Sequence, residues 1–285
     1  NIGKMINENK IEAYNLPQGT IDELFRDIAA HKMGTLTHVG LNTFPDPRLE
    51  GGKMNPRTTE DIVELVEVLG EERLLYKTMP INIAFIRGTT ADETGNVTLE
   101  HECCTTEATS IAQAAKNSGG KVVVQVERVV QAGSLDPKLV KIPGIYVDAI
   151  VVCDDPTKHM QCQGCEYDGS MTGEYRVPLG SLEYPPMSAK KIIARRAAME
   201  LQPNTVVNLG IGLPEQISMV AAEEGIGDYM TLTVEAGPVG GVPQGGSKFG
   251  GAVNVECILD QAYQFDFYDG GGVDLAFLGL AQADK

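Results

Sequence analysis

Short runs of β-branched and apolar residues alternate with amphipathic segments along the chain, and this alternation limits the possible folds more than any other feature. The apolar runs have the length of strands and lie at residues 82–88, 121–130, 145–153, 205–212, 230–237 and 273–280. The amphipathic segments carry residues that begin and end helices and lie at residues 20–32, 58–70, 106–120, 188–201 and 214–225. Strands that alternate with helices predict an α/β fold with largely parallel sheets covered by helices.

Residues 153–186 lack a sustained period and are rich in turn residues, which is typical of a linker. We therefore predict a first half at residues 1–152 and a second half at residues 187–285. The sequence NIAFIRGTTADE (82–93) aligns without gaps on DLAFLGLAQADK (274–285), so we expect two related α/β/α halves. The first copy continues into a turn and another strand, whereas the second copy ends the chain. We expect a fragment whose second half is incomplete.

The net charge of −16 argues against a surface for nucleic acid or an anionic membrane, because both require clustered Lys and Arg. It does not exclude an anionic small molecule, which contacts only a local site. No apolar run reaches the ~18 residues of a membrane span, and no signal peptide is visible. These features predict a cytoplasmic protein without nucleic-acid or membrane partners.

Six cysteines are scattered along the chain, and free thiols are expected in a large chain that lacks a secretion signal. Cys162 and Cys165 have the C-x-x-C spacing of metal or redox sites, and His159 is nearby. A zinc site requires about four ligands, but the sequence has no second C-x-x-C pair. A polar loop with free thiols is therefore favoured over a metal or redox role. The four histidines show neither triad nor metal spacing, so we expect them to be structural and expect no metal site.

The segment VNLGIGLPEQ (207–216) combines a strand, a Gly-x-Gly turn and a helix start. Backbone N–H groups at such a helix start favour an anion. The segment is a poor dinucleotide motif because Glu215 replaces the third glycine. Asn208, Gly210 and Gly212 fall at the carboxyl end of the strand, where ligands bind in open parallel sheets. A plain strand-to-helix turn remains the alternative.

The segment TLTVEAGPVGG (231–241) places a lone carboxylate, Glu235, where a strand gives way to a glycine-rich loop. The residue can be a solvated loop residue. It can also be a nucleophile, because a desolvated carboxylate attacks an activated acyl group. The glycines that follow, Gly237 among them, would let a substrate approach the backbone and could donate N–H groups to an oxyanion.

The segment YNLPQGTIDEL (14–24) places Gln18 at another turn that leads into a helix. Because Pro17 and Gly19 flank it, Gln18 is equally well explained as a turn residue and as a ligand-binding residue.

Four segments, VNLGIGLPE, TVEAGPVGG, NLPQGT and IRGTTADETGNVT, together resemble the acyl-CoA:carboxylate CoA-transferases that use a glutamate nucleophile. The similarity is greatest to the single-chain, short-chain branch, the propionate or acetate CoA-transferase-like proteins, and it runs from about residue 2 to residue 285. The family also has a glycine-rich strand–loop that opens its first half and glycine-rich loops beyond the equivalent of Lys285. Neither occurs in this chain, so we expect truncation at both ends.

The resemblance implies a fold of two α/β halves with the site between them. It implies that Glu235 becomes a γ-glutamyl-CoA thioester and that Asn208 holds CoA or the intermediate near it. It also implies that Gln18 approaches from the first half and that the Gly237 backbone is an oxyanion donor. The expected partners are acyl-CoA and small carboxylates, with CoA as a substrate and no other cofactor. Exposed surfaces between the halves lead us to expect a homo-oligomer.

Two other classes of protein remain open at this point. A sugar-phosphate isomerase or deaminase of similar architecture would use the carboxylate as a proton-transfer base and would require a phosphate-binding loop. A non-catalytic metabolite-binding domain would bind its ligand reversibly. Burst release of acid from acyl-CoA distinguishes a transferase from both.

Overall fold

The computed structural model describes residues 1–178, 184–280 and 282. Residues 179–183 of the predicted linker, and residues 281 and 283–285 of the predicted second half, lie outside the described residues. The chain divides into two compact units, one made of Asn1–Phe85 and Ala108–Val123 and the other of Ile86–Glu107 and Val124–Lys285. This division follows compactness rather than sequence halves, and the predicted halves and linker stay a prediction.

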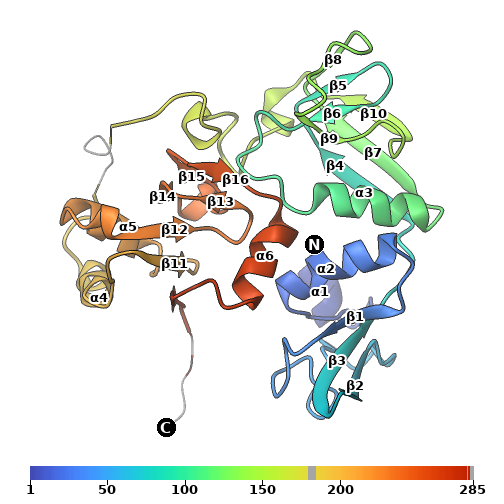
Figure 1. The fold of residues 1–285 in the computed structure, drawn as a ribbon, viewed down its shortest axis with the longest axis horizontal. Helices are drawn as coiled ribbons and strands as arrows, with labels where there is room; N and C mark the ends of the chain where they lie inside the picture. The colour runs from blue at the N-terminus through green and yellow to red at the C-terminus, as the bar shows by residue number, and fades with distance from the viewer. Residues whose placement is uncertain (179–183, 281, 283–285) are drawn as a thin grey trace. The chain divides into compact units, whose positions relative to one another are not determined.

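The first unit combines helices with a small antiparallel sheet (Figure 1). Its helices are α1 (Ile2–Asn7), α2 (Gln18–Ala29) and α3 (Ala108–Asn117). The strands β1 (Gly34–Thr37), β2 (Val63–Val68) and β3 (Glu71–Lys77) pair in the order β1-β3-β2. Helix α2 packs against α3, and Leu24, Ile28, Leu74 and Tyr76 form the centre of a shared apolar core.

The prediction of a helix at residues 58–70 is wrong, because this segment contains strand β2. Ile62, Leu65, Val66 and Leu69 satisfy helical spacing, but β-branched residues also recur through VELVEV. Leu69 and Gly70 both have positive φ angles, 55° and 82°, as a two-residue hairpin turn requires. The turn places β2 antiparallel to β3, which the sequence analysis did not predict.

The predicted strands in the middle of the chain are found as β4 (Ile83–Arg87), β7 (Lys121–Val126) and β10 (Ala149–Val152), in the order β10-β7-β4. A second sheet contains β5 (Thr90–Asp92), β6 (Val97–Thr98), β8 (Arg128–Val130) and β9 (Val140–Ile142), in the order β8-β5-β6-β9. Strands β5 and β8 are parallel, whereas β6 is antiparallel to β5 and β9.

The last part of the second unit is built on a five-stranded sheet in the order β16-β13-β12-β11-β17. Its strands are β11 (Thr205–Leu209), β12 (Met230–Thr233), β13 (Pro238–Val239), β16 (Cys257–Ile258) and β17 (Leu275–Phe277). Strand β11 is parallel to both β12 and β17. The remaining elements are the β14–β15 hairpin (Val242–Pro243 with Ala252–Val253) and helices α4 (Ala189–Ala198), α5 (Gln216–Glu223) and α6 (Gln261–Asp269).

Helices α4 and α5 cover this sheet through apolar residues of β11 and β12. Val207 on the sheet and Val220 on α5 are fully buried, as is Ala194 on α4. Short 3-10 turns lie at Pro156–Lys158, Gly169–Met171, Gly227–Tyr229 and Gly246–Lys248. The α/β fold class is confirmed, with the correction that short antiparallel hairpins supplement the parallel strands. Within the described ranges, no helix has the length and apolar composition needed to cross a bilayer.

Candidate active site

Glu235 lies at the tip of a tight turn between β12 and β13. The turn is closed by the Gly237 N–H, which donates to the Val234 carbonyl at 3.0 Å. Beyond it, Val239 pairs antiparallel with Thr233. Gly237 has φ +123°, and a Cβ atom there would lie 2.1 Å from the Leu259 carbonyl oxygen. Only glycine can therefore make this turn, which holds the half-buried Glu235 at the carboxyl end of a parallel strand.

The structure brings Asn208 to Glu235. Asn208 lies on β11 directly opposite Thr233 of the neighbouring β12. Its side-chain Nδ2 donates to the Thr233 carbonyl at 3.3 Å and to Glu235 Oε2 at 3.4 Å. One amide therefore contacts both the strand end and the carboxylate, so its position relative to Glu235 is set by the strand register.

Two further polar residues at this site, Tyr268 and Gln264, both lie on α6, and the sequence did not point to either of them. The Tyr268 hydroxyl, from α6, donates to Thr233 Oγ1 at 2.7 Å and accepts from Gln264 Nε2 at 3.0 Å. It also lies 3.4 Å from Asn208 Nδ2. Burial, with a smaller effect of the Glu235 carboxylate, raises the pKa of Tyr268. The hydroxyl thus stays protonated near neutral pH and braces the end of β12.

A sequence signal for α6 existed, since Asp260 caps the helix and Gly270 follows its end. The helix is rich in aromatic residues, which have modest helix propensity, and it lacks a clear apolar face. Tyr268 is therefore placed by tertiary packing rather than by a local pattern.

The Gly-x-Gly loop follows β11, as predicted, and leads into α5. The Gly210 N–H donates to the Phe277 carbonyl at 2.8 Å, so it serves the sheet rather than a ligand. Gly212 is exposed with φ +87°, and a Cβ atom there would meet nothing within 4 Å. Helix α5 begins at Gln216, two residues after the predicted start at Pro214.

The Gly237 N–H is used within the turn, so it is not free to bind an oxyanion in this conformation. The turn has other N–H groups. Among the described residues, no acceptor is found for the backbone N–H of Glu235 or of Ala236. Ala236 is the better candidate donor for an oxyanion formed beside the Glu235 carboxylate.

Gln18 belongs to the first compact unit, whereas Asn208 and Glu235 belong to the second. It is the first residue of α2 and follows Pro17, whose extended backbone leads into the helix. Its predicted role at the site stays a prediction.

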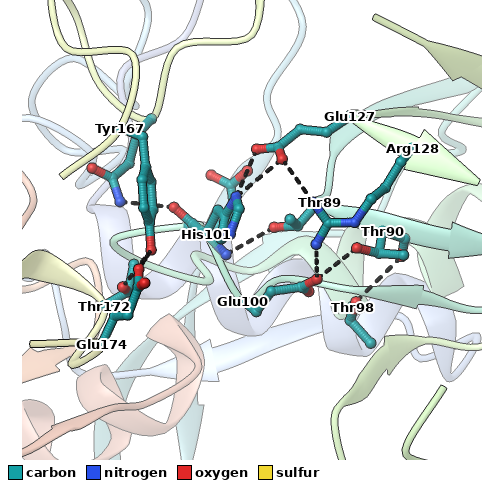
Figure 2. Close-up of polar contacts among 12 residues, drawn as sticks. Thr89, Thr90, Thr98, Glu100, His101, Glu127, Arg128, Tyr167, Thr172 and Glu174 are labelled. Carbon is teal, nitrogen blue, oxygen red and sulfur yellow. Dashed lines mark hydrogen bonds and ion pairs between the residues drawn. The ribbon is translucent and has the colours of Figure 1, made fainter. Parts of the chain in front are cut away.

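A second polar cluster surrounds His101, which the sequence analysis treated as structural (Figure 2). The imidazole Nδ1 lies 3.0 Å from both carboxylate oxygens of Glu127. The Tyr167 ring lies against the imidazole, with centroids 4.3 Å apart.

Glu100 accepts from Thr90 Oγ1 at 2.5 Å and pairs with Arg128 at 3.0 Å. Burial taken alone raises the pKa of Glu100, but the hydrogen bonds from Thr90 and Thr98 and the charge of Arg128 act together in the other direction, so the pKa is lowered. The cluster joins three separate chain segments.

The cysteines of the C-x-x-C pair are free thiols, as are the other four. Cys162 and Cys165 pack in one cluster with Cys103 and Cys104. In the part of the chain that the structure describes, no three His, Cys, Asp or Glu side chains gather so as to hold a metal ion.

Comparison with known proteins places these features in a family. Residues 1–153 match the family described as Coenzyme A transferase. The chain is 48% identical to caffeate CoA-transferase of Acetobacterium woodii over 281 residues, which are 99% of this chain and 54% of that protein. It is 42% identical to acetate CoA-transferase YdiF of Escherichia coli O157:H7 over 284 residues, or 100% of this chain and 53% of that protein.

YdiF also provides similar solved structures. Its apoenzyme superposes with a TM-score of 0.88 at 42% identity, over 96% of this chain and 51% of that chain. A second YdiF structure, described as a thioester complex with CoA, gives a TM-score of 0.87 at 41% identity over the same shares, 96% and 51%. The chain thus spans about half the length of the relatives it matches.

Proposed function

Because this chain belongs to the coenzyme A transferase family, we propose that it carries the nucleophile of an enzyme that moves CoA between a short-chain acyl-CoA and a carboxylate. The observation that carries the proposal is the contact of Asn208 Nδ2 with Glu235 Oε2, 3.4 Å, at the carboxyl end of β12. The relatives support it, because they are named for CoA transfer to caffeate and acetate.

In the first step, the ionised Glu235 carboxylate attacks the thioester carbonyl of an acyl-CoA. A bond forms between the carboxylate oxygen and the acyl carbon, and CoA leaves as a thiolate. The product is a mixed anhydride between the acyl group and Glu235. The Ala236 N–H would stabilise the oxyanion of the intermediate, and Asn208 would hold the carboxylate in the attacking orientation.

In the second step, the CoA thiolate attacks the γ-carbonyl carbon of Glu235. The anhydride bond breaks, the first carboxylic acid leaves as its carboxylate, and Glu235 is left as a thioester of CoA. A thioester complex with CoA in YdiF is consistent with such an intermediate. An acceptor carboxylate then reverses the two steps, which predicts ping-pong kinetics.

Each step exchanges one activated acyl group for another of similar energy, so the reaction needs CoA as a substrate but no ATP. Water must be kept from the anhydride and the thioester, because both hydrolyse. A cytoplasmic location and a homo-oligomeric state are further parts of the proposal, and size-exclusion chromatography with light scattering tests the second.

The test is a pair of matched glutamate-to-glutamine changes in the full-length protein. Glu235→Gln removes the nucleophile and is expected to abolish transfer of CoA from acetyl-CoA to propionate. Glu256→Gln alters an exposed carboxylate in the segment before β16 and is expected to leave the rate within about twofold. Full transfer activity in the Glu235→Gln protein would overturn the proposal.

A further inference from the structure

The C-x-x-C segment forms a tight hairpin that holds its two thiols opposite each other. Cys162 N–H donates to the Cys165 carbonyl at 3.4 Å, and Cys165 N–H donates back to the Cys162 carbonyl at 3.1 Å. Gly164, with φ +77°, makes the turn between them. Residues paired in this way have Cα atoms about 5.5 Å apart and side chains on the same face. A disulfide requires Cα atoms about 4.4–6.8 Å apart, so this pair meets the requirement.

The hairpin is fixed at its base by the neighbouring segment. The Arg87 guanidinium donates to the carbonyls of Met160 and Gln161. The Gln161 amide Nε2 donates to the His101 carbonyl at 2.8 Å, and its Oε1 accepts from the Asp168 N–H at 3.0 Å.

The segment that follows the hairpin is held as well, because the Tyr167 ring lies against His101 (Figure 2). These contacts hold the two cysteines opposite each other, so the thiols are positioned by the structure around the hairpin.

The two thiols differ in access. Cys165 is half-buried and lines an open cavity of about 520 Å³, which Lys248 and Tyr175 also line. Cys162 is half-buried as well but is not among the residues that line this cavity, and both cysteines pack against the cluster that contains the buried Cys103 and Met171. Burial, with smaller effects of the neighbouring thiols, raises the pKa of Cys162 to about 12. A reagent in solution therefore reaches Cys165 first, and Cys162 is the slower, internal partner.

We propose that Cys162 and Cys165 form a reversible thiol–disulfide site that reacts with small-molecule disulfides such as glutathione disulfide. The Cys165 thiolate attacks one sulfur of glutathione disulfide, forms a mixed disulfide and releases one glutathione thiolate. Cys162 gives its proton to solvent and attacks the Cys165 sulfur, which releases the second glutathione thiolate. The two protein thiols lose two electrons and two protons, and glutathione disulfide becomes two molecules of glutathione.

The hairpin is joined to the glycine-rich loop that follows Glu235 in the sequence. Asp168 Oδ2 pairs with Lys248 Nζ at 2.9 Å. A Cβ atom on Gly164 would lie 3.6 Å from Ser247 Oγ, so the turn of the hairpin lies against the same loop. The hairpin thus lies beside the loop that carries Ser247 and Lys248, and Cys165 and Lys248 line the same cavity.

The sequence allows a direct test by peptide mass. Trypsin cleavage after Lys158 and Arg176 releases residues 159–176, which contain Cys162 and Cys165 but no other cysteine. The full-length protein is incubated with glutathione disulfide, alkylated with N-ethylmaleimide and digested. We expect this peptide to be lighter than the reduced peptide by two hydrogens and to take up alkylating reagent only after treatment with dithiothreitol.

Two changes provide the controls. In Cys162→Ser, the mixed disulfide with glutathione on Cys165 is expected to persist, because nothing resolves it. In Cys257→Ser, which removes an exposed cysteine elsewhere in the same unit, the 159–176 disulfide is expected to form as in the unaltered protein. The unaltered protein alone decides the question if a variant fails to fold.

Two results would overturn the proposal. One is full alkylation of Cys162 and Cys165 after the oxidant has glutathionylated Cys257. The other is a disulfide between Cys162 and Cys103, which would appear as two cross-linked tryptic peptides because Cys103 lies in residues 88–116.

Discussion

Asn208 Nδ2 lies 3.4 Å from Glu235 Oε2 and 3.3 Å from the Thr233 carbonyl oxygen, so one amide links the end of β12 to the carboxylate two residues further on. The link exists because β11 and β12 are parallel neighbours with Asn208 opposite Thr233. The orientation of the Glu235 carboxylate therefore depends on how β11 and β12 pair, and not on the loop alone.

The contact predicts a rate effect without loss of stability. Asn208→Ala leaves the Glu235 carboxylate free to rotate, and a misplacement of about 1 Å can lower a rate about 100-fold. We expect a fall of that order in kcat/KM for CoA transfer. Asn208→Asp is expected to be worse, because a second carboxylate beside Glu235 disfavours its ionised form. Steady-state kinetics with thermal melts measure both, and an unchanged kcat/KM in Asn208→Ala contradicts the role.

The Tyr268 hydroxyl predicts a stability effect. Tyr268→Phe removes the acceptor of Gln264, whose side chain is 1% exposed, and an unpaired buried polar group costs about 1–3 kcal/mol. Tyr229→Phe, at an exposed tyrosine of the same unit, is expected to change the free energy of unfolding by less than about 0.5 kcal/mol. Denaturant titration compares the two, and equal effects would show that the hydroxyl is not needed.

Alanine substitutions at two glycines near the site, Gly212 and Gly237, distinguish the cost of a steric clash from the cost of backbone strain. Gly212→Ala meets open space and costs only the strain of its positive φ, about 1–2 kcal/mol. Gly237→Ala adds to that strain a Cβ atom 2.1 Å from the Leu259 carbonyl, so the turn must move. We expect Gly237→Ala to lower the melting temperature more and to lower transfer as well. The ranking is wrong if Gly212→Ala is the more destabilised protein.

Tyr76 predicts a loss of stability at alkaline pH. Its ring is fully buried in the core of the first unit, and burial raises the pKa of Tyr76 to about 12. In the unfolded state the Tyr76 hydroxyl loses its proton near pH 10, whereas in the folded state it keeps the proton up to about pH 12. The contribution of the protonated hydroxyl to the free energy of unfolding is therefore complete below pH 10 and is lost as the pH rises from 10 to about 12.

Denaturant titrations across this pH range measure the effect. Tyr76→Phe should be less stable than the unaltered protein at pH 7, because the Val39 carbonyl loses its donor. The difference between the two proteins should shrink toward pH 12. A constant difference from pH 9 to pH 12 would contradict the assignment.

Secondary structure was predicted best from the sequence where the local residue pattern and the tertiary packing favour the same element. Val122, Val124 and Val126 alternate as a strand should, and they are buried on one face of β7. It failed at residues 58–70, where VELVEV satisfies both a helical and a strand period and only pairing with β3 decides. The strand end at Glu235 was readable from its glycines. Tyr268 was not, because its hydroxyl reaches Thr233 through the packing of a helix 28 residues beyond the end of β12.

The most direct test of the account is the mass of the peptide that contains Glu235 after the full-length protein is incubated with acetyl-CoA and rapidly digested. We expect a CoA adduct on Glu235 that hydroxylamine converts to a hydroxamate, and no such adduct in Glu235→Gln. An enzyme that transfers CoA while this peptide stays unmodified, with the label on another residue, would contradict it.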